Sequence, residues 1–194
     1  MFDHGSTRGS RPSALIWQSL RTRLPAQPID QSDRHCWLMR RDLGPQERVD
    51  NRAHTAIREG FSIRDAVQIH QLLTLGYQNG GGSVPAYSDW LRAFENDPEF
   101  DPALCYSLWN GPQLAGVIQC CTSAFIKDLV VHPRARRQGV GLALLNQAFT
   151  TFSLRGEGAV DLNVIENNLA ARRLYEKAGM RYVQRREMTS PCLA

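Results

Sequence analysis

The 194-residue chain has 23 basic and 19 acidic side chains, which give a formal net charge of +4. This small surplus does not indicate a nucleic-acid partner, and no run of about 18 apolar residues predicts a membrane span. The five cysteines include no C-x-x-C pair, and the five histidines show neither H-x-x-x-H nor H-E-x-x-H spacing. We therefore expect reduced thiols in a cytoplasmic protein, and no metal site.

The first part of the chain is polar and rich in proline. Residues 1–34 predict a flexible tail with one short helix at 14–24, which Pro25 ends. The tail lacks the apolar core that a secretory signal needs. Residues 35–52 predict an extra strand, HCWLMRRDL, followed by a linker. The main domain is expected to span residues 53–194.

The main domain alternates between strand-like and helix-like patterns. Gly111 and Pro112 are typical of a hairpin turn, and two later helices each connect two strands. This order predicts an α/β fold with a mixed, mostly antiparallel central sheet and helices on both faces. The predicted elements are strand 54–60, helix 63–75 after Ser62, helix 89–95, strands 104–110, 113–121 and 124–131, helix 139–155, strand 159–165, helix 168–178 and strand 180–188.

The stretch LVVHPRARRQGVGLALL, residues 129–145, joins a strand to a helix through a short turn with two glycines. The first N–H groups of a helix have no partner within it, and residues without side chains let an anion reach them. Gly139 and Gly141 occupy this position, and Arg134, Arg136 and Arg137 add positive charge. The turn predicts a phosphate-binding site; alternatively, the glycines only permit close packing and the arginines are solvated.

The glycine spacing narrows the kind of phosphate compound. Leu142 after Gly141 excludes the G-K-[ST] of a P-loop, and Leu144 stands where a dinucleotide fold needs its third glycine. The pattern R-x-x-G-x-G between a strand and a helix resembles the pyrophosphate-binding loop of the GNAT superfamily of N-acetyltransferases. The pattern N-x-x-A-x-x-L-Y-E-K-x-G-M, at 168–180, resembles the second motif of that superfamily. The likeness extends over about residues 53–189.

This resemblance implies a GNAT-like acyl-CoA N-acyltransferase fold, with acetyl-CoA as the cosubstrate and no metal. The implied reaction is acetyl transfer to a primary amine, by direct attack within a ternary complex. From their places in the two motifs, the residues expected to contact the cosubstrate are Leu129, Val130, Val131, Arg136, Arg137, Gln138, Gly139, Val140, Gly141, Asn168, Ala171 and Tyr175.

Such a transfer needs a base for the amine, a donor for the oxyanion and an acid for the departing thiolate. The resemblance implies Tyr175 as the acid and the backbone N–H of Val131 as the oxyanion donor. Asp128 is the first candidate for the base and Glu166 the second. Asp128 would equally suit a surface ion pair. A tyrosine in an amphipathic helix is more often part of the core, but the place of Tyr175 in the motif favours the acid.

The adjacent thiols of Cys120 and Cys121 suggest a different route, through an acetyl-enzyme. Neither thiol has a base or a positive charge nearby in the sequence that would favour the thiolate. We therefore expect buried strand thiols and direct transfer.

In this superfamily, the loop between the first two helices usually shapes the acceptor site. Tyr77, Tyr87 and Trp90 are therefore predicted to contact the acceptor, with packing on the core as the alternative. The acceptor is expected to be a small-molecule or peptide amine. The stretch CWLMRRDLG also resembles the last strand of such a domain, so we consider three roles for it: a degenerate preceding unit, an extra edge strand or a homodimer contact.

Two other functions fit parts of the sequence. A non-catalytic acyl-CoA-binding or sensing module would keep the phosphate-binding turn and lose the base. A nucleic-acid binder would use the arginines of PRARRQ and RYVQRRE, but no stacking aromatic residues interleave with the first cluster. We expect neither a nucleic-acid partner nor a membrane.

Overall fold

The computed structural model describes residues 35–44, 57–78 and 83–188. The predicted tail at 1–34, with its helix, and most of the predicted linker lie outside the described residues. The elements are β1 (His35–Asp42), β2 (Ile57–Glu59), α1 (Ala66–Tyr77), α2 (Tyr87–Glu95), β3 (Phe100–Asn110), β4 (Gln113–Cys121), β5 (Phe125–Val131), the 3-10 helix η3 (Pro133–Ala135), α3 (Val140–Leu154), β6 (Ala159–Ile165), α4 (Leu169–Lys177) and β7 (Arg181–Glu187).

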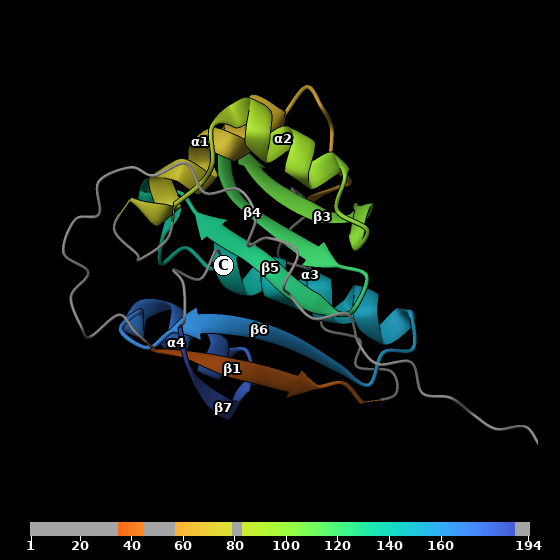
Figure 1. Cartoon of the computed structure of the whole chain (residues 1–194), viewed down its shortest axis with the longest axis vertical. Helices are drawn as coiled ribbons and strands as arrows, with labels where there is room; N and C mark the ends of the chain where they lie inside the picture. Colours follow the sequence, from red (N-terminus) through yellow and green to blue (C-terminus); the bar gives the residue numbers. More distant parts are fainter. Residues whose placement is uncertain (1–34, 45–56, 79–82, 189–194) are drawn as a thin grey trace, which may run out of the picture.

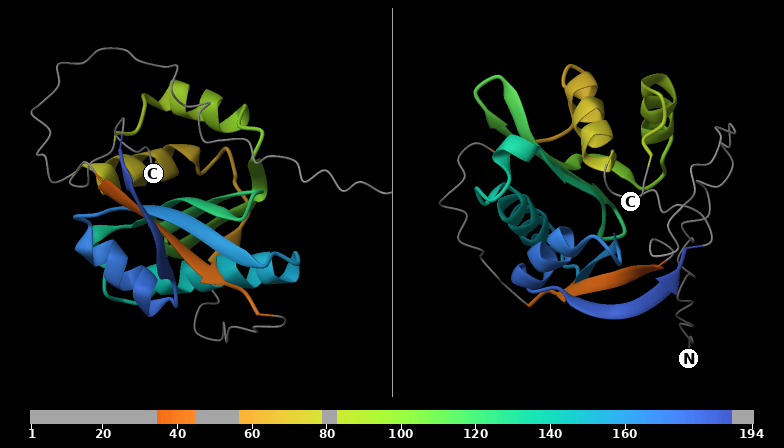
Figure 2. Two further views of the ribbon diagram at one scale, coloured as in Figure 1. Left: turned by 60° about the horizontal axis from the view of Figure 1, so that its bottom comes forward. Right: turned by 90° about the vertical axis from the view of Figure 1, so that its left-hand side faces the viewer.

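Seven strands form one sheet in the order β2-β3-β4-β5-β6-β1-β7 (Figure 1). Neighbouring strands are antiparallel except for β5 and β6, which are parallel. Helices α1 and α2 lie on one side of the sheet, and α3 and α4 lie on the other (Figure 2). The predicted mixed, mostly antiparallel sheet with helices on both faces is thus confirmed.

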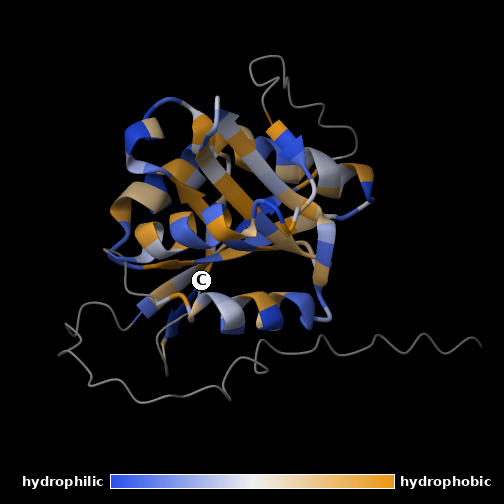
Figure 3. Ribbon diagram, turned by 90° about the horizontal axis from the view of Figure 1, so that it is seen from above, coloured by the Kyte–Doolittle hydropathy of each residue, from blue (hydrophilic) through white to orange (hydrophobic). Residues whose placement is uncertain are grey.

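Each face of the sheet has its own hydrophobic core. The α3–α4 core is built on the buried side of α3, where Val140, Leu144 and Ala148 follow helical spacing. The α1–α2 core contains Leu73 of α1 and Trp90 of α2. In Figure 3 the central strands are mainly hydrophobic, whereas the helices alternate between hydrophobic and hydrophilic positions. This pattern is what amphipathic helices on a doubly covered sheet require.

Strand β1 lies inside the sheet, between β6 and β7 (Figure 1). It pairs with β6 from Cys36 to Asp42, and the Arg40 guanidinium forms two hydrogen bonds of 2.6 Å with the Asp161 carboxylate. The suggestion that this segment forms an extra edge strand is therefore wrong. The edge strand next to β1 is β7, which leaves most of its side chains exposed.

Strands β5 and β6 pair at only two positions, Phe125 with Asp161 and Ile126 with Leu162. Beyond these positions, the described strands continue without further pairing between them. We call the space between residues 127–131 and 163–165 the β5–β6 gap. Unpaired strand edges carry free N–H and C=O groups, so this gap is where the interior of the sheet can bind a ligand through its backbone.

Candidate active site

A turn of residues 132–141, the glycine turn, connects β5 to α3. His132 Nδ1 accepts a hydrogen bond from the Arg134 N–H at 3.2 Å, and Gln138 Nε2 donates to the Arg134 carbonyl at 2.8 Å. Gly139 precedes α3 with a φ of +83°. Because a side chain disfavours this left-handed conformation, the backbone itself calls for glycine at this position.

The glycine turn carries positive charge that is not neutralised nearby. Arg134, Arg136 and Arg137 are exposed, and none of the ion pairs among the described residues includes them. Helix α3 has no acidic residue in its first turn, where the N–H groups lack intrahelical partners and the helix dipole is positive. The turn therefore suits a multiply charged anion such as a pyrophosphate.

Gly141 has a different role from Gly139. A Cβ at position 141 would come within 2.8 Å of Leu174 Cδ2 on α4 and 3.4 Å of Val131 Cγ2, whereas a Cβ at position 139 would meet nothing within 4 Å. The bare Cα of Gly141 thus faces the packed interior between α3 and α4. At Gly139 the space beside the Cα is open, as the predicted path for an anion requires, whereas the missing side chain of Gly141 makes room for Leu174. Anion binding at both glycines stays a prediction.

The end of β5 directs one free donor into the β5–β6 gap. The N–H of His132 donates to a carbonyl of β4 at 2.9 Å. Since successive N–H groups along a strand point to opposite edges, the Val131 N–H points toward β6. The Val131 carbonyl, on the same edge, accepts a hydrogen bond from Arg136 Nε at 3.4 Å. The side chains here pack: Leu129 and Val131 against the α3–α4 core, and Val130 in the α1–α2 core.

Asp128, on β5, is the only buried acidic side chain among the described residues, with 7% exposure. The Tyr77 hydroxyl of α1 donates a hydrogen bond of 2.6 Å to Asp128 Oδ1. Burial raises the pKa of Asp128 to about 6, and the Tyr77 hydrogen bond and the Lys127 charge oppose this rise. Such a carboxylate is ionised at pH 7 and is more basic than an exposed one. A surface ion pair of Asp128 is excluded, because Lys127 binds Asp97 at 2.9 Å.

Tyr175 lies on the opposite face of the sheet from Tyr77, where the charge of Asp128 still acts on it. It lies on α4 within the α3–α4 core and is 8% exposed. Burial, followed by the negative charge of Asp128, raises the pKa of Tyr175 above its usual value. The phenol therefore keeps its proton at physiological pH and remains a hydrogen-bond donor. The structure thus brings together the predicted acid, the first candidate for the base, and Tyr77.

Glu166, the second candidate for the base, is held in an ion pair. Arg185 Nη2 lies 2.6 Å from Glu166 Oε2, and Trp37 Nε1 donates to Glu166 Oε1 at 3.3 Å. The Arg185 guanidinium holds the pKa of Glu166 below its usual value. A weakly basic carboxylate that already binds two donors is a poor proton acceptor, so Asp128 is the better candidate.

The strand thiols are unsuited to nucleophilic attack. Burial raises the pKa of Cys120 well above its usual value and the pKa of Cys121 to about 12. Since the thiolate is the nucleophile, these protonated thiols favour a route without an acetyl-cysteine.

The other predicted contact residues lie in different surroundings. Asn168 Oδ1 accepts the Ala171 N–H at 3.1 Å and thereby caps α4. Trp90 is buried and stacks on Phe94 with ring centroids 5.3 Å apart, and Tyr87 packs against the Trp90 ring. Among the three aromatic residues predicted for the acceptor, Tyr77 alone contacts Asp128. Gln138 and Val140 lie in the glycine turn, with Gln138 exposed and Val140 buried.

Sequence reasoning missed two amides near Asp128. Gln119 on β4 is 2% exposed and is the register partner of Asp128, yet neither its Oε1 nor its Nε2 has a hydrogen-bond partner in the described structure. Asn163 Oδ1 on β6 is likewise buried without a partner. The signal that could have found Gln119 is its place in the otherwise apolar run LAGVIQCC, since glutamine is rarely buried in a central strand.

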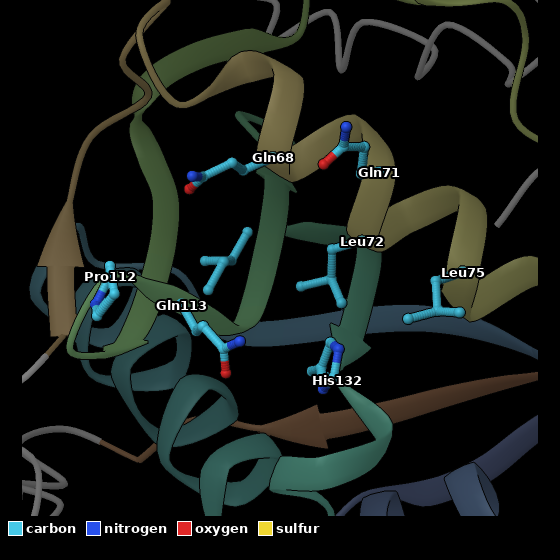
Figure 4. Close-up of a pocket in the computed structure, with 8 residues that line it drawn as sticks. Gln68, Gln71, Leu72, Leu75, Pro112, Gln113 and His132 are labelled. Carbon is cyan, nitrogen blue, oxygen red and sulfur yellow. The ribbon is translucent and has the colours of Figure 1, made fainter.

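A hollow of about 310 Å³ lies between α1 and the β3–β4 turn, and neither Asp128 nor Gln119 lines it (Figure 4). It is lined by Gln68, Gln71, Leu72, Leu75, Pro112, Gln113, Leu114 and His132. It shares only His132 with the glycine turn. Among all the described residues, no group of three His, Cys, Asp or Glu side chains is arranged to hold a metal ion. No helix in the described part of the chain has the length and apolarity needed to cross a membrane.

Comparison with known proteins gives one family and a common fold. The family described as "Acetyltransferase (GNAT) family" matches residues 66–180. A GCN5-related N-acetyltransferase from Sphaerobacter thermophilus superposes with a TM-score of 0.64 at 24% identity, over 78% of this chain and 49% of that chain. A putative GNAT acetyltransferase from Novosphingobium aromaticivorans gives a TM-score of 0.58 at 17% identity, over 78% and 61% of the two chains.

The ribosomal-protein-S18-alanine N-acetyltransferase of Escherichia coli is similar over 63% of this chain and 75% of its own, with a TM-score of 0.51 and 21% identity. The present chain spans about half of the Sphaerobacter protein and about three fifths of the Novosphingobium protein. No curated protein sequence matches it. At these identities the structural likeness shows the fold alone.

Proposed function

Because the chain belongs to the GNAT acetyltransferase family, we propose that it transfers an acetyl group from acetyl-CoA to a primary amine, by direct attack within a ternary complex. The observation that carries this proposal is the buried Asp128, held beside the β5–β6 gap by the Tyr77 hydroxyl. A module that only bound an acyl-CoA would not need a carboxylate whose charge is disfavoured by burial.

The glycine turn supports the binding of acetyl-CoA, which supplies the acetyl group as an activated thioester. Its three exposed arginines and the free N–H groups of α3 match the charge of a pyrophosphate. The neighbouring β5–β6 gap has unpaired backbone edges that suit an extended arm with amide groups. In this arrangement the Val131 N–H donates to the acetyl carbonyl oxygen, where negative charge develops during attack.

The proton transfers are assigned to two side chains. Asp128 accepts the proton that the amine must lose, directly or through one water, because it is ionised at pH 7 and basic for a carboxylate. Tyr175 donates its proton to the sulfur that leaves the acetyl group. The proton on Asp128 then returns to solvent, and solvent restores the phenol. The buried, protonated cysteines support this route over an acetyl-enzyme.

The acceptor and the compartment complete the proposal. The acceptor is a small-molecule or peptide amine that reaches Asp128 from the α1–α2 side, where Tyr77 lies. Cys105, Cys120 and Cys121 are free, buried thiols in the described part of the chain, which supports a reducing, cytoplasmic compartment.

Two measurements test the proposal. Calorimetry should detect acetyl-CoA binding, and Arg136→Ala should weaken it by about three- to tenfold. The control Arg64→Ala, an exposed position in the turn before α1, should not weaken it. A thiol-release assay over a panel of primary amines should then show release that depends on the amine. Folded protein that binds no acetyl-CoA would refute the proposal. Binding without thiol release for any amine would instead support the acyl-CoA-binding module.

A further inference from the structure

Gln119 and Asp128 form a polar pair on the α1–α2 side of the sheet. They are register partners on β4 and β5, and cross-strand partners project from the same face. Val117, two residues before Gln119, packs in the α1–α2 core, and Asp128 binds Tyr77 of α1. The side chain of Gln119 therefore lies opposite the proposed base on the β4–β5 ladder.

Asn163 adds a third polar group to the same side. Its neighbours Leu162 and Val164 pack in the α3–α4 core. Because side chains alternate along a strand, Asn163 faces the opposite side, which is the side of Asp128. Three neighbouring strands thus each place one polar side chain on one face, next to the β5–β6 gap.

Three polar atoms of these two side chains have no hydrogen-bond partner among the described residues. Gln119 is 2% exposed with both its Oε1 and its Nε2 unbonded, and Asn163 Oδ1 is buried and unbonded. A buried polar group without a hydrogen bond destabilises a fold, so native proteins nearly always satisfy such groups or use them. An apolar side chain at position 119 would fit the surrounding run without this penalty. A ligand that forms hydrogen bonds with these atoms would explain why polar side chains stand at these buried positions.

We propose that Gln119 and Asn163 bind the acceptor, and that the acceptor is an α-amino amide: an amino-acid amide or the N-terminal residue of a peptide. The Gln119 amide offers one acceptor and one donor side by side, which another amide can satisfy at once. A hydroxyl has its donor and its acceptor on one oxygen and so cannot align with both groups at once, a protonated polyamine offers only donors, and a free carboxylate would be repelled by Asp128. Asn163 Oδ1 supplies a further acceptor for an amide N–H. This inference rests on the proposed function.

The test compares two amines of the same shape, glycinamide and isobutylamine, with the full-length protein. The variant Gln119→Met keeps the size of the side chain and removes both hydrogen-bonding groups. We expect the ratio of kcat/KM for glycinamide to kcat/KM for isobutylamine to fall about tenfold in this variant, mainly through the KM for glycinamide. Comparing ratios cancels the difference in the intrinsic reactivity of the two amines. The melting temperature should stay the same or rise, because a buried unbonded amide is removed.

The matched control is Gln113→Met, the same change at an exposed position on the same strand. It should leave the ratio unchanged. A ratio unchanged in Gln119→Met overturns the inference, even if the wild-type protein acetylates amines. Should Gln119→Met fail to fold, Asn163→Ala reports the same ratio, and an unchanged value there overturns it equally. Wild-type protein that acetylates no amine defeats the proposed function, and this inference with it.

Discussion

The two faces of the central sheet differ in how they treat polar groups. On the α3–α4 face, the core is built mainly from apolar side chains around α3, and Tyr175 is buried among them. On the α1–α2 face, Asp128 and Gln119 are buried in strands that elsewhere carry valine and isoleucine. The α3–α4 face stabilises the sheet, whereas the buried polar groups on the α1–α2 face destabilise it where β5 and β6 separate. Such a local loss of stability is expected where a protein prepares a site for chemistry.

The largest effect is expected from Asp128→Asn, which removes the base and keeps its shape. The value of kcat/KM should fall by about 10²- to 10⁴-fold, because general base catalysis contributes this much. The free energy of unfolding should rise by about 1–3 kcal/mol at pH 7 and above, because burial disfavours the ionised carboxylate that the variant lacks. Assays of amine acetylation and denaturant unfolding measure the two quantities.

The pH dependence gives this prediction its control. The folded-state pKa of Asp128, about 6, lies above the ordinary value of 3.8, so the folded protein binds more protons than the unfolded chain between these values. Wild-type stability therefore decreases as the pH rises from about 4 to 6, and Asp128→Asn should not show this decrease. The stability gain of the variant should vanish below about pH 4. If Asp128→Asn were less stable than the wild type at pH 7 and fully active, Asp128 would be a stabilising residue and not the base.

Tyr175→Phe should have the next largest effect, because it removes the proposed acid from the otherwise apolar face. We expect kcat to fall by about 10- to 100-fold and the dissociation constant for acetyl-CoA to change by less than about twofold, since the ring itself remains. Single-turnover kinetics and calorimetry separate the two quantities. Tyr106→Phe is the matched control, because Tyr106 is buried in the same core and its hydroxyl binds Thr151 at 2.8 Å. Equal losses of kcat in both variants would assign Tyr175 a structural role.

The apolar face could be predicted from the sequence more completely than the polar one. The helical spacing of Val140, Leu144 and Ala148 is a local property of the chain, and the predicted helix at 139–155 is confirmed as α3 at 140–154. The predicted start of α1 is less accurate. Ser62 accepts a hydrogen bond from the Arg64 N–H within a turn, so the helix begins at Ala66 and not at residue 63.

The features that depend on distant pairing could not be read from the sequence. The position of β1 between β6 and β7 is decided by pairing between segments more than a hundred residues apart, which no local pattern encodes. The burial of Asp128 depends on Tyr77, which is also remote in the chain. Gly141 shows the same limit: only the packing of α4 against α3 reveals that its missing side chain makes room for Leu174.

Tyr77→Phe should produce a smaller, pH-dependent change on the polar face. The Tyr77 hydrogen bond lowers the pKa of Asp128 against the effect of burial, so its loss should move the acid limb of kcat/KM from about pH 6 to a higher pH. The rate well above this limb should change by only a few-fold, because the carboxylate is then ionised in both proteins. The pH profile of kcat/KM measures the shift, and Tyr87→Phe is the control. An acid limb that stays in place would mean that Asp128 does not govern the profile.

The smallest effect is expected from Cys120→Ala, on the α3–α4 face. Burial raises the pKa of this thiol well above its usual value, so it provides no thiolate, and kcat should remain within about twofold of the wild-type value. Stability should fall by about 1 kcal/mol, because the substitution leaves a small cavity in a packed core. Intact-mass spectrometry during turnover with acetyl-CoA should find no acetylated protein. An acetylated intermediate that disappears in Cys120→Ala would contradict direct transfer, and would assign the reaction to a cysteine on the α3–α4 face.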